Sequence, residues 1–266
     1  MKKILYSALL LIALASVACK EAIDLNLEDE KYSRLVVEGN VTDQYTRHTV
    51  LLTSTSPYDQ NVACPKASGA TVSLNDGTST WALTETEPGV YMTDSMAGEI
   101  GKTYTLSIQY KGESFSAISV MKPSMTIDSL TANYLFTADN MLHYEVQISG
   151  QDNPIEEEYF LGIPSLNGEK FNEIYFWCLY SDQMTNGTYL KNYSLGVYEL
   201  FPGLILKIEW QSISKEYFDF IYQLMMNSYQ DPMFSGPPAN VKGNISNGAL
   251  GYFSASAVTS VEKIIP

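Results

Sequence analysis

A chain of 266 residues in which 45% are hydrophobic is long enough for one large domain or two small ones, each with a substantial core. Only 17% of its residues are charged, and 30 Asp and Glu against 16 Lys and Arg give a formal net charge of -14. Nucleic acids and anionic lipid headgroups are bound by clustered Lys and Arg, so this acidic balance argues against both as partners.

The N-terminus has the pattern of a secretory signal peptide. Residues 1–3 supply positive charge, residues 4–15 form an apolar run too short to remain as a membrane span, and residues 16–18 are small. Cys19 follows directly, as in a lipoprotein signal, in which the cysteine is diacylated and becomes the mature N-terminus. An ordinary signal peptide with an incidental cysteine is the alternative, since Ser16 stands where leucine is more usual. We predict a signal peptide over residues 1–18 and a lipid anchor at Cys19.

The next segment, residues 19–32, is acidic with weak apolar alternation and is predicted to be a tether. From residue 33 to residue 123 the pattern becomes that of short strands with turns about every ten residues. The seven expected strands are 35–41, 49–53, 70–74, 80–84, 90–92, 101–110 and 114–120. Glycines in the turns between them supply the positive φ angles of tight hairpins. This spacing predicts an immunoglobulin-like or transthyretin-like β-sandwich over residues 33–123.

Residues 124–266 are predicted to form a second β-rich domain, because Pro123 cannot continue a β-ladder. It begins with residues 125–135, and its expected strands are 142–149, 159–163, 174–179, 204–210 and 256–264. One amphipathic helix is expected near 214–230, where Ser214 can cap the N-terminus. Its core-packing face would consist of Tyr217, Phe220, Ile221, Leu224 and Met225. The predicted fold class is mainly β: a sandwich followed by a β-rich domain with one helix.

Catalytic motifs are missing from the sequence. His48 and His143 stand outside any zinc-binding pattern, and there is neither a Gly-x-Ser-x-Gly motif nor a P-loop. Cys64 and Cys178 are expected to be free thiols, with a disulfide between them as the alternative. We therefore predict no catalytic residues and no cofactor, and expect that the protein is not an enzyme. A hydrolase of unrecognised type is a further alternative.

Acidic residues provide the other candidates for chemistry. The run 156–158 consists of three glutamates after Asn153-Pro154, and we interpret it as a solvated loop. Asp76 and Asp94 stand in turns, where Asp bonds the local backbone. A calcium site built from loop carboxylates is an open alternative, but EF-hand spacing is absent and no metal site is predicted.

Three groups of residues, in a fixed order along the chain, carry a family resemblance. Cys19 is followed by the run 35–39; 69–72 precedes 89–91 and 101–104; and 243–245 leads into 248–253. In these features the chain resembles a Bacteroidetes lipoprotein family, the domain of unknown function number 4249. The resemblance implies an accessory partner of a TonB-dependent outer-membrane transporter, and it brings no catalytic residues.

Lys20 and Glu21 are similar to the short signal that sends Bacteroidetes lipoproteins to the cell surface, although Ala22 replaces a second acid. We therefore expect a lipid-anchored outer-membrane protein, exposed at the surface, that helps a TonB-dependent transporter to capture a nutrient. Loops rich in Tyr and Trp would contact the ligand, for which peptide, glycan and metal chelate all remain open. The alternative is a structural or assembly lipoprotein of the envelope that binds only protein partners.

Overall fold

The computed structural model describes residues 33–56, 62–154, 157–228 and 241–266. The predicted signal peptide (1–18) and tether (19–32) lie outside this part of the chain. By their contacts, residues Arg34–Pro266 form one unit. The described residues are mainly β with one α-helix, which confirms the fold class predicted from the sequence.

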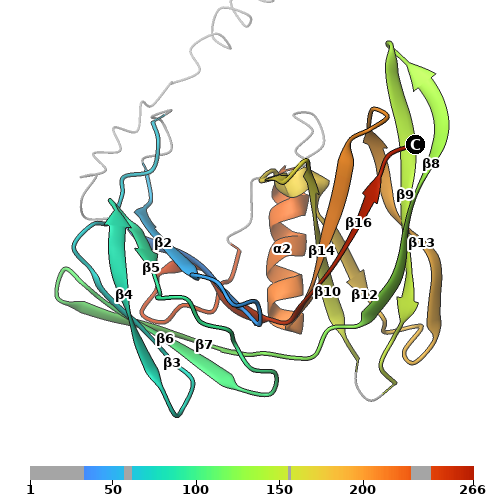
Figure 1. Cartoon of the computed structure of the whole chain (residues 1–266). Helices are drawn as coiled ribbons and strands as arrows, with labels where there is room; N and C mark the ends of the chain where they lie inside the picture. Colours follow the sequence, from blue (N-terminus) through green and yellow to red (C-terminus); the bar gives the residue numbers. More distant parts are fainter. Residues whose placement is uncertain (1–32, 57–61, 155–156, 229–240) are drawn as a thin grey trace, which may run out of the picture. The chain divides into compact units, whose positions relative to one another are not determined.

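An eight-stranded sheet contains all seven strands predicted for the N-terminal half, together with one strand from near the C-terminus (Figure 1). The order is β15-β1-β2-β5-β4-β3-β6-β7, antiparallel except for the pair β1–β15. The strands are β1 (Leu35–Thr42), β2 (Thr49–Ser54), β3 (Thr71–Asn75), β4 (Thr80–Glu87), β5 (Val90–Met92), β6 (Thr103–Tyr110), β7 (Glu113–Val120) and β15 (Leu250–Ser256). Apolar and polar side chains alternate along them, so one face of each strand fills a common core.

The two outer strands of this sheet lie next to each other, which gives a sandwich-like arrangement. The backbone N–H of Ala255 in β15 donates to the hydroxyl of Ser119 in β7 at 2.9 Å. Just before β15, the N–H of Ser246 donates to the carbonyl oxygen of Ser116 at 2.8 Å. The enclosed core includes the fully buried side chains of Val37, Leu52, Leu106, Ile108 and Phe253.

Strand β15 belongs to this first sheet, whereas the sequence analysis placed its residues in the second domain. Gly251 permits the parallel pairing, because its φ is +91° and a Cβ there would overlap the carbonyl oxygen of Val37 in β1. The side chain of Asn244 also holds β15, accepting from the N–H of Phe253 at 2.9 Å and donating to its carbonyl at 2.8 Å. Pairing between segments so distant in the chain leaves no local pattern in the sequence.

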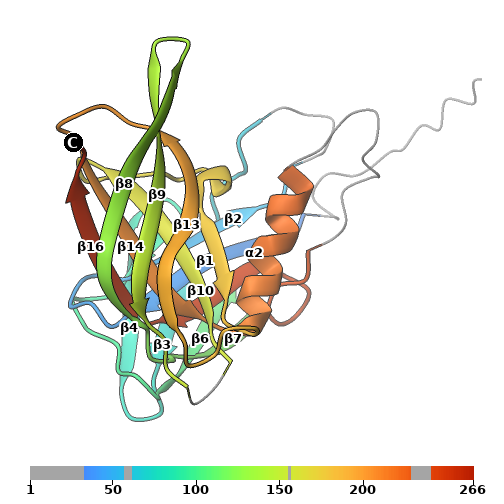
Figure 2. The same cartoon turned by 90° about the vertical axis from the view of Figure 1, so that its right-hand side faces the viewer.

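Two further sheets enclose a second core (Figure 2). One has the order β13-β9-β8 and consists of β8 (Thr126–Ala138), β9 (Met141–Gln151) and β13 (Tyr189–Glu199). The other has the order β11-β10-β14-β16, with β12 also paired to β10. Its strands are β10 (Tyr159–Leu166), β11 (Glu169–Lys170), β12 (Cys178–Ser181), β14 (Ile205–Ile213) and β16 (Val258–Ile264). At the centre, the ring of Trp210 lies 5.7 Å from that of Phe160 and 6.2 Å from that of Tyr180.

The helix predicted near 214–230 is α2 (Lys215–Ser228). Ser214 caps it as expected, since its hydroxyl accepts from the N–H of Tyr217 at 3.1 Å. Phe220 and Ile221 are buried in a third cluster, which includes residues of β10 and Tyr252 of β15. Within the described part of the chain, no helix has the length and apolarity needed to cross a membrane.

Two details of the second half differ from the sequence prediction. The expected strand at 174–179 is a 3₁₀ helix, η1 (Ile174–Phe176), followed by the short strand β12. Strand β13 was not predicted, and its pairing with β9 contains two register shifts. Such irregularities interrupt the period-two alternation by which a strand is recognised in a sequence.

Candidate functional site

A groove of about 710 Å³ lies between strands of the first sheet and the helix-bearing side of the second half. Strands β1, β2 and β15 contribute to one wall, and β10, η1 and α2 contribute to the other. Its volume lies in the range of small-molecule binding sites. The apolar lining residues are Val36, Leu51, Leu161, Ile163, Ile174, Trp177, Tyr217, Phe220, Ile221, Leu224, Val241, Leu250 and Tyr252.

Three aromatic rings that contact one another line the groove. The ring of Tyr252 lies 4.5 Å from that of Tyr217 and 5.2 Å from that of Phe220. The hydroxyl of Tyr252 is 3.3 Å from the hydroxyl of Ser214, which ties this ring to the start of α2. Burial raises the pKa of the Tyr217 hydroxyl, so this residue remains neutral. Rings held in this way offer a rigid surface to an apolar or planar ligand group.

Polar residues also line the groove, among them Glu38, Asn40 and Gln211. The side-chain amide of Asn40 donates to Gln211 Oε1 at 3.0 Å, while Asn40 Oδ1 is buried without a partner among the described residues. Lys170 Nζ lies 2.6 Å from Glu209 Oε2. A second hollow of about 460 Å³ shares Asn40 and Lys170 with the groove and adds Arg47, Lys207 and Glu209. Glu209 also pairs with Lys207, at 3.5 Å. The combined site suits a molecule with both apolar and polar groups.

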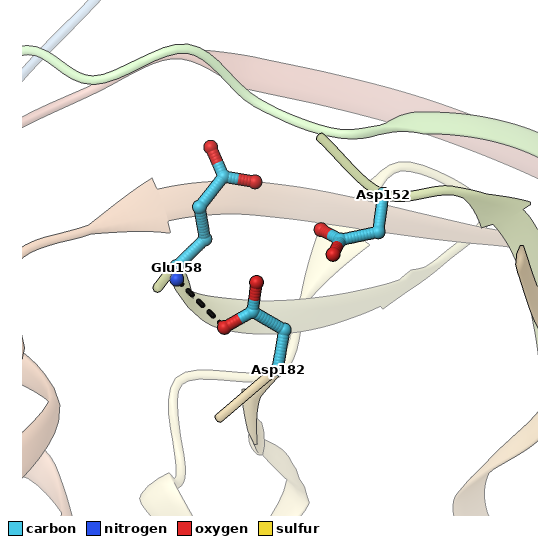
Figure 3. Close-up of side chains that lie close together, drawn as sticks. All are labelled: Asp152, Glu158 and Asp182. Carbon is cyan, nitrogen blue, oxygen red and sulfur yellow. Dashed lines mark hydrogen bonds between the residues drawn. The ribbon is translucent and has the colours of Figure 1, made fainter. Parts of the chain in front are cut away.

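A cluster of buried acids lies elsewhere, in the second half of the chain. We call Asp152, Glu158 and Asp182 the acid cluster; their exposed fractions are 3%, 4% and 0%. They lie just after β9, just before β10 and just after β12, and their side chains lie close together (Figure 3). One carboxylate oxygen from each residue lies within 4.8 Å of one from each of the others.

Backbone amides hold two of these carboxylates in place. Asp182 Oδ1 accepts from the N–H of Glu158 at 2.7 Å, and Asp152 Oδ2 accepts from the N–H of Gly187 at 2.7 Å. The remaining oxygens, Asp152 Oδ1 and Asp182 Oδ2, and also Glu158 Oε2, are buried without a hydrogen-bond partner in the described structure. Buried polar atoms in proteins are nearly always satisfied, so three unsatisfied oxygens in one place require an explanation.

The environment of the cluster disfavours negative charge. Burial, followed by the neighbouring carboxylates of Asp152 and Asp182, raises the pKa of Glu158 to about 7, against a lowering by Lys122. Burial also raises the pKa of Asp182. Without a compensating cation, three carboxylates so close together repel one another.

The burial of Glu158 corrects the interpretation of 156–158 as a solvated loop. Glu157 is only partly buried and bonds the hydroxyl of Tyr159, while Glu156 lies outside the described residues. Residues 157 and 158 immediately precede β10, where successive side chains point to opposite faces of the strand. One glutamate of a polar run is therefore directed inward.

The other residues considered in the sequence analysis have structural roles or lie outside the described residues. Cys19, Lys20 and Glu21 lie outside them. Cys64 and Cys178 are free thiols in the described structure, and burial raises the pKa of Cys178 to about 12, which makes it unreactive. Asp76 Oδ1 accepts from the N–H groups of Thr78 and Ser79, as expected for a turn, and the bond to Ser79 is the largest cause of its lowered pKa.

The two histidines lie in different surroundings. His48 is buried directly before β2, where Nε2 donates to the carbonyl of Met96 at 3.0 Å and Nδ1 accepts from the N–H of Thr42 at 3.4 Å. His143 lies in β9, and its ring stacks on Phe136 at 4.6 Å. His48 lines the second hollow, whereas neither histidine lines the groove itself or belongs to the acid cluster.

Comparison with family models gives one match. The model for a domain of unknown function, DUF4249, matches residues 20–262. The chain belongs to this family. This confirms the family resemblance inferred from the sequence, and the groove and the acid cluster both fall within the DUF4249 domain. A search among curated proteins finds no match.

Proposed function

We propose that this DUF4249 protein is a non-enzymatic binding lipoprotein that serves a TonB-dependent outer-membrane transporter in nutrient capture. In this proposal Cys19 carries the lipid anchor, and Lys20 and Glu21 direct the protein to the cell surface. The lipoprotein-type pattern of residues 1–19 supports the anchor. The observation that carries the binding role is the groove, which combines aromatic side chains with amide and charged side chains.

A ligand screen by thermal unfolding tests this role. Peptides, oligosaccharides and metal chelates are each added to the purified protein, and a compound that binds the folded state raises the melting temperature. In the Leu51→Lys variant, a charge placed on the apolar wall of the groove is expected to abolish that increase. Ile205→Lys is the matched control, because Leu51 and Ile205 are similarly exposed (36% and 42%) and Ile205 lies outside the groove.

The proposal fails if no class of compound raises the melting temperature. It also fails if an active compound raises the melting temperatures of Leu51→Lys and Ile205→Lys equally. Fluorescence of Trp177, which lines the groove, gives a second readout. A ligand in the groove should change the emission of the wild type more than that of Trp177→Phe.

The anchor is tested separately. Metabolic labelling with a radioactive fatty acid should mark the wild type, and Cys19→Ala should be unlabelled. Labelling of Cys19→Ala to the wild-type level would refute a lipid anchor at Cys19. Protease treatment of intact cells then tests surface exposure, because a surface protein is degraded and a periplasmic one is protected.

One feature favours protein partners and keeps the structural or assembly role as a second candidate. The hairpin of β8 and β9 extends beyond its neighbour β13 (Figure 2). Near its tip Tyr134, Leu135 and Phe136 are 55%, 45% and 49% exposed. Adjacent exposed aromatic and aliphatic side chains are typical of protein interaction sites.

Purification from outer membranes distinguishes the two roles. In nutrient capture, the protein should bring down a TonB-dependent transporter, and Phe136→Ser should reduce the yield if the hairpin makes the contact. Recovery of envelope proteins without any transporter, combined with a failed ligand screen, would favour the structural role.

A further inference from the structure

The acid cluster lacks an obvious structural purpose. A buried carboxylate is normally satisfied by several donors or paired with a cation, because removing its charge from water is costly. Here three carboxylates each keep one buried oxygen without a hydrogen-bond partner in the described part of the chain. The positive charge of Lys122 acts on Glu158, but it is one cation for three acids.

Backbone hydrogen bonds also fix the positions of two carboxylates of the acid cluster. The backbone amides of Glu158 and Gly187 fix one oxygen of Asp182 and one of Asp152, which leaves the second oxygen of each for another partner. The amide of Gly187 depends on a glycine at this position: its φ is +77°, and a Cβ would lie 2.7 Å from the Cβ of Pro154. A loop conformation that only glycine adopts easily thus positions one carboxylate of the cluster.

From this geometry we propose that Asp152, Glu158 and Asp182 form a binding site for a divalent cation, and that the cation is Ca²⁺. Carboxylate oxygens are the ligands of hard cations, and Ca²⁺ holds each oxygen at about 2.3–2.6 Å. Two oxygens on one Ca²⁺ can therefore be up to about 5 Å apart, and the 4.8 Å limit within this cluster fits that span. Mg²⁺ requires a tighter octahedron at about 2.0–2.1 Å and is expected to bind more weakly.

This site is independent of the groove and of the proposed transport role. None of the three acids lines the groove, so the loss of nutrient binding would leave the cation site unaffected. The bound ion would link the ends of β9, β10 and β12, which belong to two different sheets, and would thereby stabilise the second half of the chain.

Calcium titration of the purified chain tests the proposal. After dialysis against EDTA and its removal, CaCl₂ is added during calorimetric titration and during thermal unfolding at pH 7.5. We expect one site per chain and, at tenfold excess over the dissociation constant, a rise in melting temperature of about 3–5 °C. MgCl₂ at the same concentration should give a smaller rise.

Amide variants show whether the ion lies in this cluster. Asp182→Asn preserves the acceptor for the Glu158 amide but removes a charge, so calcium affinity should fall at least tenfold while the protein still folds. Asp152→Asn should behave in the same way. Glu169→Gln is the control, since Glu169 is an exposed acid in β11 and should leave calcium affinity unchanged.

Two results would overturn the proposal. If millimolar Ca²⁺ produces neither heat nor a shift in the wild type, the carboxylates are satisfied by a shared proton instead. If Asp152→Asn and Asp182→Asn bind Ca²⁺ as tightly as the wild type does, the ion binds elsewhere. The titration of the wild type remains decisive even if a variant fails to fold.

Discussion

His48, directly before β2, and the acid cluster in the second half are both buried polar groups, but they differ in how they are satisfied. Each ring nitrogen of His48 has a backbone partner, Met96 O or the Thr42 amide. Each acid of the cluster keeps an oxygen without a hydrogen-bond partner among the described residues. A satisfied buried group stabilises the fold, whereas an unsatisfied one is retained at a cost and indicates a further role.

The largest effect should come from removing the satisfied group. His48→Leu removes the side-chain partner of the Thr42 amide and leaves the Met96 carbonyl with only the bond from the Thr46 N–H, so the free energy of unfolding should fall by about 1–3 kcal/mol. Urea denaturation measures this change in the free energy of unfolding. His143→Leu serves as the control, because His143 is only partly buried and should change stability by less than about 1 kcal/mol. Equal losses in the two variants would show that the bonds of His48 contribute little.

The acid cluster should respond in the opposite direction. In the presence of EDTA, Asp182→Asn removes one of three repelling charges and gives the neighbouring carboxylates a donor. The free energy of unfolding should therefore rise by about 1–2 kcal/mol at pH 7.5. A loss of stability comparable to that of His48→Leu would mean that the cluster is satisfied without a cation.

The pH dependence of His48 provides a smaller test. Burial lowers the pKa of its imidazole below the usual 6.5, so the unfolded chain binds a proton more readily than the folded one. The stabilisation is complete above pH 6.5 and is lost as the pH falls through the folded-state pKa. The contribution of His48 to the free energy of unfolding should change by no more than about 1.4 kcal/mol per pH unit. Between pH 7.5 and 5, the free energy of unfolding measured with urea should fall more steeply in the wild type than in His48→Gln. Parallel pH curves for the two proteins would contradict a role of His48 in this pH dependence.

The smallest effect is expected where charge is exposed. Lys170 and Glu209 form an ion pair of 2.6 Å, but the Lys170 side chain is 52% exposed. Water screens such a pair, so Lys170→Ala should cost no more than about 0.5–1 kcal/mol, and less at high salt. Urea denaturation of the wild type and Lys170→Ala at low and high salt measures this loss. A larger loss of stability that does not depend on salt would show that an exposed ion pair can contribute as much as a buried one. Burial would then not distinguish the acid cluster from exposed charged residues.

The sequence predicts much of the fold because its strands are regular. The seven strands of the N-terminal half alternate strictly enough to be recognised, and Ser214 together with the stripe beginning at Tyr217 predicts α2. Two strands have no local signal in the sequence, for different reasons. β15 pairs with β1 from the other end of the chain, and the alternation of β13 is interrupted by register shifts.

The functional sites were harder to predict for the same reason. Asp152, Glu158 and Asp182 look like unrelated loop acids, and only the pairing of β10 with β12 and the position of β9 bring them together. The only local signal for Glu158 is its place directly before an apolar strand. The groove likewise combines β1, β10 and α2, although two of its aromatic residues, Tyr217 and Phe220, were recognised as part of the apolar face of a helix.

The claim that unsatisfied buried acids mark a cation site is tested most directly by crystallography. Crystals grown with millimolar CaCl₂ and measured at long wavelength should show an anomalous difference peak between Asp152, Glu158 and Asp182, with metal–oxygen distances of about 2.3–2.6 Å. A map without such a peak, in which two of these carboxylates lie in a short oxygen–oxygen contact, would show a shared proton and contradict the account.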